Sequence, residues 1–195
     1  MRFTSTAVAF FASIITVSAA GVPDGSYTVT RHSNGTQVFP PVDANAAPII
    51  LTPEDLAALR TANRRDMLSS SGLNKLSKRR IDCWGYQLDE SGIDAAYQML
   101  ANWAGSGRDI CSNTPGRQNW HAEISEQMMV YYCVKQSGKC GNADRQDISY
   151  AMAQMDSKCR RYEASWFGWP SSFEIVGKGR AGDDVCKGGM DGVPY

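Results

Sequence analysis

The chain has 195 residues, and its apolar share of 43% is ordinary for one or two globular domains. Its 20 basic and 20 acidic side chains balance, but they are unevenly placed along the chain. Residues 21–80 carry 8 basic and 5 acidic side chains, whereas residues 81–195 carry 11 and 15. The second part is mildly acidic. This charge argues against a nucleic acid partner, because contacts to phosphates need a basic face.

The first 20 residues have the pattern of a secretory signal peptide. Arg2 supplies the positive charge, an apolar run extends from Ala7 to Val17, and the small residues Ser18-Ala19-Ala20 offer a cleavage site. A run of this length is too short to cross a bilayer, so we expect a secreted, extracellular protein that does not span a membrane.

Cysteine and tryptophan are confined to the second part of the chain. An oxidising secretory route favours three disulfides, and six cysteines allow 15 pairings that sequence cannot resolve. All five tryptophans lie after residue 80, and so do all six cysteines: Cys83, Cys111, Cys133, Cys140, Cys159 and Cys186. We therefore interpret residues 81–195 as a mature cysteine-rich domain and residues 21–80 as a propeptide or leader.

The leader contains two predicted elements. β-prone runs at 26–30 and 36–39 flank Asn34-Gly35, which favours a hairpin turn. Asn34 also opens a possible glycosylation sequon. A short helix is predicted to begin after Thr52, with Pro53 at its first position.

A processing site is predicted at the end of the leader. Lys78, Arg79 and Arg80 follow a serine-rich linker at 69–72, and paired basic residues in an accessible chain suit a furin-like or kexin-like protease. Arg64-Arg65 is a weaker second pair because it falls at the end of the helical pattern. We expect a proprotein that is cleaved after Arg80.

The mature domain is predicted to be α+β. Strands are expected at 81–88, 118–124, 128–134 and 172–178, and the unbroken apolar run at 128–134 indicates a central strand covered on both faces. Helices are expected to begin at Ser91 and Asp144, each with a capping-box pattern. This order predicts a four-stranded antiparallel sheet with two helices on one face, a split βαβ α/β-sandwich stapled by disulfides. The first and third strands would then be neighbours, which makes a Cys83–Cys133 bridge geometrically possible.

One pair of side chains could support acid-base chemistry. His121 and Glu123 lie two apart on a predicted strand, hence on one face, as a secreted ribonuclease-like hydrolase could use. The alternative is that they are half-exposed polar residues on an edge strand. The adjacent acids Asp89-Glu90 and Asp183-Asp184 are expected to serve a helix start and solvated turns. We expect no metal, because no CxxC, HExxH or calcium-loop spacing occurs. We also expect no catalytic residue and no cofactor.

An aromatic stretch offers a candidate recognition site. Trp166, Phe167 and Trp169 stand beside Gly168 and Pro170, so a loop is predicted with at least one ring on the surface. The alternative is that the rings cover the sheet face opposite the helices.

The layout as a whole resembles a known group of proteins. A signal, a leader and a dibasic site precede a domain with Cys83-Trp84-Gly85-Tyr86 and Tyr131-Tyr132-Cys133-Val134. This resembles the small secreted cysteine-rich fungal proteins of the killer-toxin-like and necrosis-inducing effector group. The resemblance implies a disulfide-held α/β sandwich and an extracellular role in antagonism or host interaction, and it carries over no functional residue. The six cysteines, with six residues between Cys133 and Cys140, depart from any one family pattern.

Three functions follow as hypotheses from the sequence. The first is a non-enzymatic secreted effector or toxin-like protein that recognises an unknown extracellular protein or cell surface. The second is a small ribonuclease-like hydrolase that uses His121 and Glu123. A structural cell-wall protein is disfavoured, because the apolar residues follow core periodicities.

Overall fold

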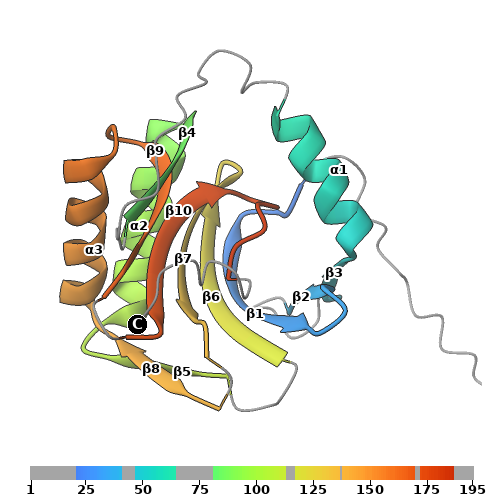
Figure 1. Cartoon of the computed structure of the whole chain (residues 1–195), viewed down its shortest axis with the longest axis horizontal. Helices are drawn as coiled ribbons and strands as arrows, with labels where there is room; N and C mark the ends of the chain where they lie inside the picture. The colour runs from blue at the N-terminus through green and yellow to red at the C-terminus, as the bar shows by residue number, and fades with distance from the viewer. Residues whose placement is uncertain are drawn as a thin grey trace, which may run out of the picture.

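The computed structural model describes residues 21–40, 47–64, 81–112, 117–136, 138–169 and 172–186. The predicted signal peptide, residues 1–20, and the predicted processing site Lys78-Arg79-Arg80 lie outside these residues. The described part of the chain forms three helices and ten strands, whose arrangement can be followed in Figure 1. The helices are α1 (Pro53–Arg64), α2 (Glu90–Ala104) and α3 (Arg145–Lys158). The strands are β1 (Gly25–His32), β2 (Gln37–Phe39), β3 (Ile49–Leu51), β4 (Ile81–Gln87), β5 (Arg108–Cys111), β6 (Arg117–Ser125), β7 (Met128–Val134), β8 (Cys140–Ala143), β9 (Glu163–Gly168) and β10 (Glu174–Arg180).

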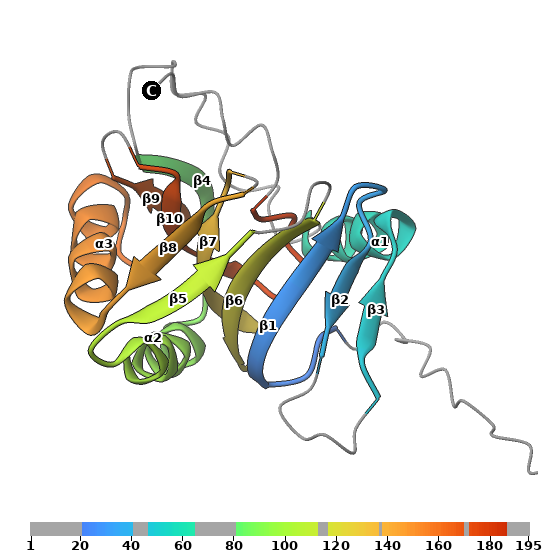
Figure 2. The same cartoon turned by 90° about the horizontal axis from the view of Figure 1, so that it is seen from below.

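Eight strands form one antiparallel sheet in the order β3-β2-β1-β6-β7-β10-β9-β4, and β5 and β8 form a separate two-stranded sheet (Figures 1 and 2). The α+β class is confirmed, but the main sheet has eight strands where four were expected. Three of the extra strands, β1 to β3, come from the predicted leader. The N-terminal segment and the cysteine-rich part of the chain therefore share a single sheet.

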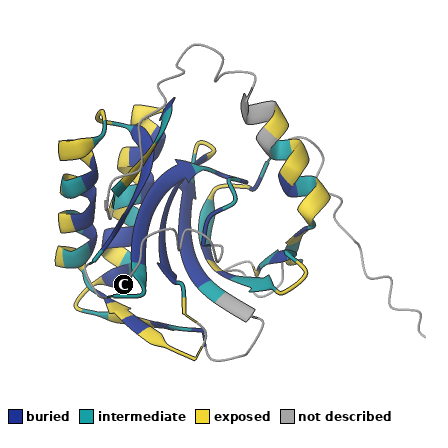
Figure 3. Ribbon diagram, in the orientation of Figure 1, coloured by how far each residue is buried: buried dark blue, intermediate teal, exposed yellow. Residues whose placement is uncertain are grey.

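Two helices lie on one face of this sheet, as predicted (Figure 1). Alternating residues of β7 point to the two faces, and those on the helix side, including Val130 and Tyr132, pack in a core with Leu100 of α2 and Met155 of α3. All seven residues of β7 are buried, so the prediction of a central strand covered on both faces is confirmed (Figure 3).

The other face has its own core, built largely by the N-terminal segment. Met129 and Tyr131 of β7 point there, against Val29 of β1, Phe39 of β2 and Leu56 of α1. Residues 181–186 also cross this face, and Ala181, Val185 and Cys186 are buried in the same core.

The helix starts follow local side-chain chemistry. The Asp144 side chain accepts a hydrogen bond from the Asp147 N–H, and the Asp147 side chain accepts one from the Asp144 N–H, so the predicted capping box at the start of α3 is confirmed. The cap of α2 is Asp89, not Ser91, and its carboxylate accepts a hydrogen bond from the Gly92 N–H at 3.0 Å. This bond is the largest of the causes that lower the pKa of Asp89. The expected role of Asp89 at a helix start is thus confirmed. The cap of α2 lies two residues before Ser91, the predicted start of this helix.

The predicted order of the strands in the cysteine-rich part was wrong. β4 lies at the sheet edge beside β9, and β7 pairs with β10, so two strands separate the first strand from the third. The Cys83–Cys133 pairing was wrong for the same reason. The bridges are Cys83–Cys159, Cys111–Cys140 and Cys133–Cys186.

The aromatic stretch was also misassigned, because residues 163–168 form strand β9 and not a loop. β9 and β10 form a hairpin whose register pairs Gly168 with Ile175 and Trp166 with Gly177. Cys140 and Gly141 belong to β8, where Cys140 faces Cys111 of β5 across the small sheet.

The N-terminal hairpin and helix were predicted correctly. β1 and β2 pair through Thr30 with Val38, and Gly35 adopts a φ of 86° in the turn. Asn34, the candidate glycosylation site, is exposed in that turn. Thr52 precedes α1, and its hydroxyl accepts a bond from the Asp55 N–H at 3.2 Å.

Candidate functional site

The pair His121 and Glu123 lies inside the molecule, on the face of β6 that α2 covers. Nε2 of His121 is 2.8 Å from Oε1 of Glu123, and the two side chains are 2% and 3% exposed. β6 lies between β1 and β7 in the sheet. The alternative of two half-exposed residues on an edge strand was therefore wrong, because β1 of the predicted leader occupies that edge.

Two hydroxyls from β1 complete this polar cluster. Ser26 donates to Oε1 of Glu123 at 2.8 Å and lies 3.4 Å from Nε2 of His121. Oγ1 of Thr28 lies 3.3 Å from Nδ1 of His121, on the opposite side of the ring. Thr28 is exposed, so the cluster reaches solvent through the N-terminal segment.

A tryptophan of α2 covers the imidazole. The rings of Trp103 and His121 are stacked, with centroids 3.8 Å apart and an angle of 9° between their planes. The guanidinium of Arg108 lies 5.8 Å from the same indole centroid, on the scale of a cation–π contact. Trp103 thus covers one face of the imidazole, and both ring nitrogens have polar partners.

In space, the Thr28 hydroxyl, the His121 imidazole and the Glu123 carboxylate follow one another. Hydrolases use such a set of groups to activate a nucleophile. Acyl transfer also needs hydrogen-bond donors that face the developing oxyanion. Since β6 pairs on both sides and β1 pairs with both β2 and β6, ladder partners engage the backbone amides around this cluster. The arrangement buries the imidazole and the carboxylate against each other and leaves Thr28 as the exposed member of the set.

The candidate recognition residues lie in three different environments. Trp166 and Phe167 are buried on opposite faces of β9, Trp166 beside the Cys133–Cys186 core and Phe167 beneath the helices. Trp166 thus covers the face opposite α2 and α3, as the alternative for these rings expected. Trp169 is half-buried just after β9.

A short aromatic row runs from the core to the surface beside α3. Phe167 contacts Trp169 edge-on at 5.0 Å and Tyr150 edge-on at 5.7 Å. Tyr150 is 52% exposed, one of two large apolar side chains in the described residues with such exposure. We name Tyr150, Phe167 and Trp169 the aromatic row. Sequence reasoning missed Tyr150, although its place off the buried stripe of α3 was a signal that it faces outward.

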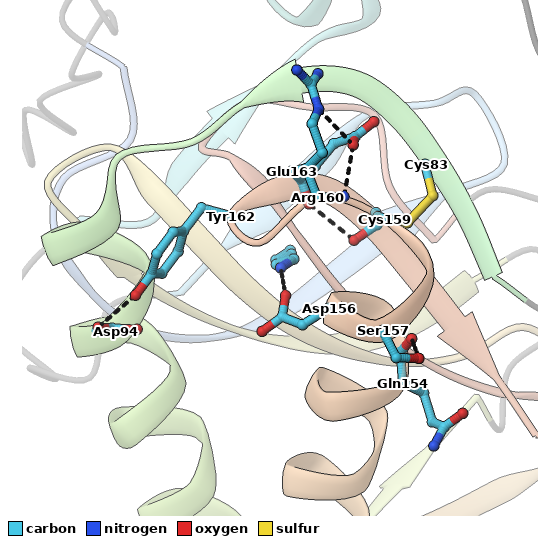
Figure 4. Close-up of polar contacts among 11 residues, drawn as sticks. Cys83, Asp94, Gln154, Asp156, Ser157, Cys159, Arg160, Tyr162 and Glu163 are labelled. Carbon is cyan, nitrogen blue, oxygen red and sulfur yellow. Dashed lines mark hydrogen bonds and ion pairs between the residues drawn. A yellow bond between two sulfur atoms is a disulfide. The ribbon is translucent and has the colours of Figure 1, made fainter.

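The C-terminal end of α3 is tightly fixed (Figure 4). Cys159 bonds to Cys83 of β4, and the Tyr162 hydroxyl donates to Asp94 of α2 at 3.1 Å. Glu163 accepts bonds from the backbone N–H groups of Gly85 and Arg160. The aromatic row lies on the same two elements, since Tyr150 belongs to α3 and Phe167 to β9.

The acids Asp183 and Asp184 are not in a solvated turn. Asp183 accepts a hydrogen bond from the Tyr86 hydroxyl, and burial, reinforced by that carboxylate, raises the pKa of Tyr86. Asp184 pairs with Arg31 of β1 at 2.5 Å. Both carboxylates hold the segment 181–186 against the sheet.

Within the described ranges, no group of three or more His, Cys, Asp or Glu residues could hold a metal ion. None of the helices described is long and apolar enough to cross a membrane. The three disulfides indicate an oxidising, extracellular compartment.

No family model, curated protein or solved structure matches the chain.

Proposed function

We propose that this is a secreted fungal effector or killer-toxin-like protein that acts by surface recognition and not by catalysis. It is made as a proprotein and cut by a kexin-like protease after Lys78-Arg79-Arg80. Its partner is a protein or cell surface outside the cell, and the aromatic row is the part of the molecule that meets it.

The observation that carries this proposal is the exposed end of the aromatic row. Tyrosine and tryptophan are the residues that most often dominate binding energy at protein interfaces. Tyr150 stands on α3 and Trp169 directly follows β9, and both rings pack edge-on against the buried Phe167, which limits the freedom that they would lose on binding. The buried, internally bonded His121–Glu123 pair favours a structural role for the one acid-base candidate.

Loss of the aromatic row is expected to abolish recognition. The fluorescently labelled double variant Tyr150→Ser, Trp169→Ser should bind to target cells at least tenfold more weakly than the labelled wild type, since interface aromatics contribute about 2 kcal/mol or more each. It should also lose growth inhibition or leaf necrosis. Ile50→Ser is the matched control, because Ile50 is 53% exposed on β3, the far edge strand of the sheet. Equal loss in both variants, or in neither, would refute a role for the row.

One observation favours a second candidate, the small secreted ribonuclease-like hydrolase that uses His121 and Glu123. Thr28 gives this pair an exposed hydroxyl at 3.3 Å from the imidazole. A Thr28→Val variant removes only that hydroxyl, and a His121→Ala variant removes the imidazole. If either lost the biological activity while its disulfides and circular dichroism stayed unchanged, and the wild type cleaved a fluorescent RNA, the non-enzymatic proposal would fail.

A further inference from the structure

We propose that the N-terminal segment, residues 21–64, is a permanent subunit of the secreted protein. After the chain is cut between this segment and residue 81, the segment stays in the sheet, and the secreted protein is a non-covalent complex of two chains. This inference rests on the processing proposed above, and it changes the meaning of the leader from a removable propeptide to a structural partner.

Backbone pairing is the first support. β1 pairs with β6 along eight residue pairs, from Gly25 with Ile124 to His32 with Arg117. β1 also pairs with β2, and β2 pairs with β3, so the segment brings a three-stranded unit to the edge of β6. Removal of the segment would leave eight of the nine residues of β6 without partners on one side, and unpaired strand edges are strongly prone to association.

The shared core is the second support. Val29, Phe39 and Leu51 of the segment are buried together with Trp120 and Ile124 of β6. Phe39 makes edge-on contacts with Tyr27 at 5.7 Å and with Trp120 at 5.8 Å. Each large apolar side chain that is fully buried at such a contact raises an association constant by about ten- to a hundredfold. Several of them are buried here, so we expect the two chains to remain associated during gel filtration.

Polar contacts fix the register of the segment. Arg31 pairs with Asp184 on the 181–186 segment at 2.5 Å, and it also donates to the Val185 carbonyl at 3.4 Å. Ser26 supplies a hydrogen bond to Glu123. Without the segment, Glu123 would lose this hydrogen-bond donor.

No covalent bond would join the two chains after cleavage. The three disulfides use all six cysteines, and each of these cysteines lies between residues 83 and 186. The two chains are therefore expected to separate in a denaturant without any reductant.

The test uses the full secreted chain with Lys78-Arg79-Arg80 replaced by the recognition sequence of a site-specific protease. After complete cutting, the protein is expected to elute from gel filtration in native buffer at the volume of the uncut protein, with both polypeptides in the peak. In concentrated guanidinium chloride without reductant, the two polypeptides are expected to separate. Elution of the N-terminal polypeptide by itself in native buffer would overturn the inference.

Two variants test whether the shared core holds the cut chains together. Val29→Ala removes two methyl groups from the shared core and should weaken the association of the cut chains about tenfold. Ser33→Asp, in the exposed turn of the same hairpin, should leave it unchanged. Circular dichroism of the uncut variants shows whether each one folds.

The processing is tested separately on the unaltered protein. N-terminal sequencing of the secreted material should give two sequences in equal amounts, one near Gly21 and one at Ile81. A single sequence near Gly21 would refute the proposed processing and leave the engineered cut to decide the inference. A single sequence at Ile81 would show that the segment is released and would overturn the inference.

Discussion

Residues 81–195 expressed behind the signal peptide without residues 21–80 are expected to accumulate poorly and to aggregate. Three strands and a helix that complete the sheet would be missing, and β6 would become an open edge. The apolar face that carries Trp120, Ala122 and Ile124 would also be uncovered. We expect the secreted yield to fall by at least tenfold and the near-ultraviolet circular dichroism of any soluble material to lose its fine structure.

The control for this truncation keeps the full chain and removes only the dibasic site. A variant with Lys78→Ala, Arg79→Ala and Arg80→Ala should be secreted and folded normally, because it retains every described element. A truncated protein that is monomeric, with native-like near-ultraviolet dichroism, would show that the N-terminal segment is dispensable for the fold.

The substitution Asp156→Ala is expected to destabilise the protein by about 3 kcal/mol, since it would leave a buried ammonium group without its partner. Lys178 lies on β10, is 0% exposed, and its Nζ is 2.5 Å from Oδ1 of Asp156 on α3. Asp156 itself is 36% exposed, so water reaches the pair from one side and the cost is expected at the low end of the range for buried pairs.

Removal of the charge at Lys178 should have a much smaller effect. Lys178→Met keeps most of the volume and no longer requires a partner, so the free energy of unfolding should change by less than about 1 kcal/mol. In the Lys178→Met background, Asp156→Ala should also cost little. Denaturant unfolding of the two single variants and the double variant measures this coupling, with Ser157→Ala on the exposed side of α3 as the control. A double variant as unstable as Asp156→Ala would contradict the account.

Local patterns predicted most of the elements because they depend on neighbouring residues. The capping box of Asp144 and Asp147, the turn at Asn34-Gly35 and the apolar run of β7 each act over a few positions. The start of α2 was missed because Asp89, Glu90 and Ser91 all suit a helix start, and only the hydrogen bond to Gly92 selects Asp89.

The pairing of distant strands could not be predicted in the same way. The alternation of β1 fits any partner strand with a matching face, so nothing local places it beside β6, about 90 residues away. The insertion of β9 and β10 between β4 and β7 is equally non-local, and it changed the disulfide pairing.

The candidate site shows the same division. The spacing of His121 and Glu123 correctly placed both side chains on one face of a strand. Their burial depends on Trp103 of α2 and on Ser26 and Thr28 of β1, which come from segments distant in sequence. The shared face of two residues that lie two positions apart on a strand is therefore predictable, whereas their access to solvent is not.

The central claim is that the N-terminal segment and the cysteine-rich part form one sheet, and hydrogen–deuterium exchange of the secreted protein tests it most directly. The amides of β1 that bond to β6 should be protected to the same degree as those of β6 and β7, because all three strands lie inside the sheet. Fast exchange along β1 and β2, with β7 and β10 still protected, would show that the segment does not belong to the folded sheet.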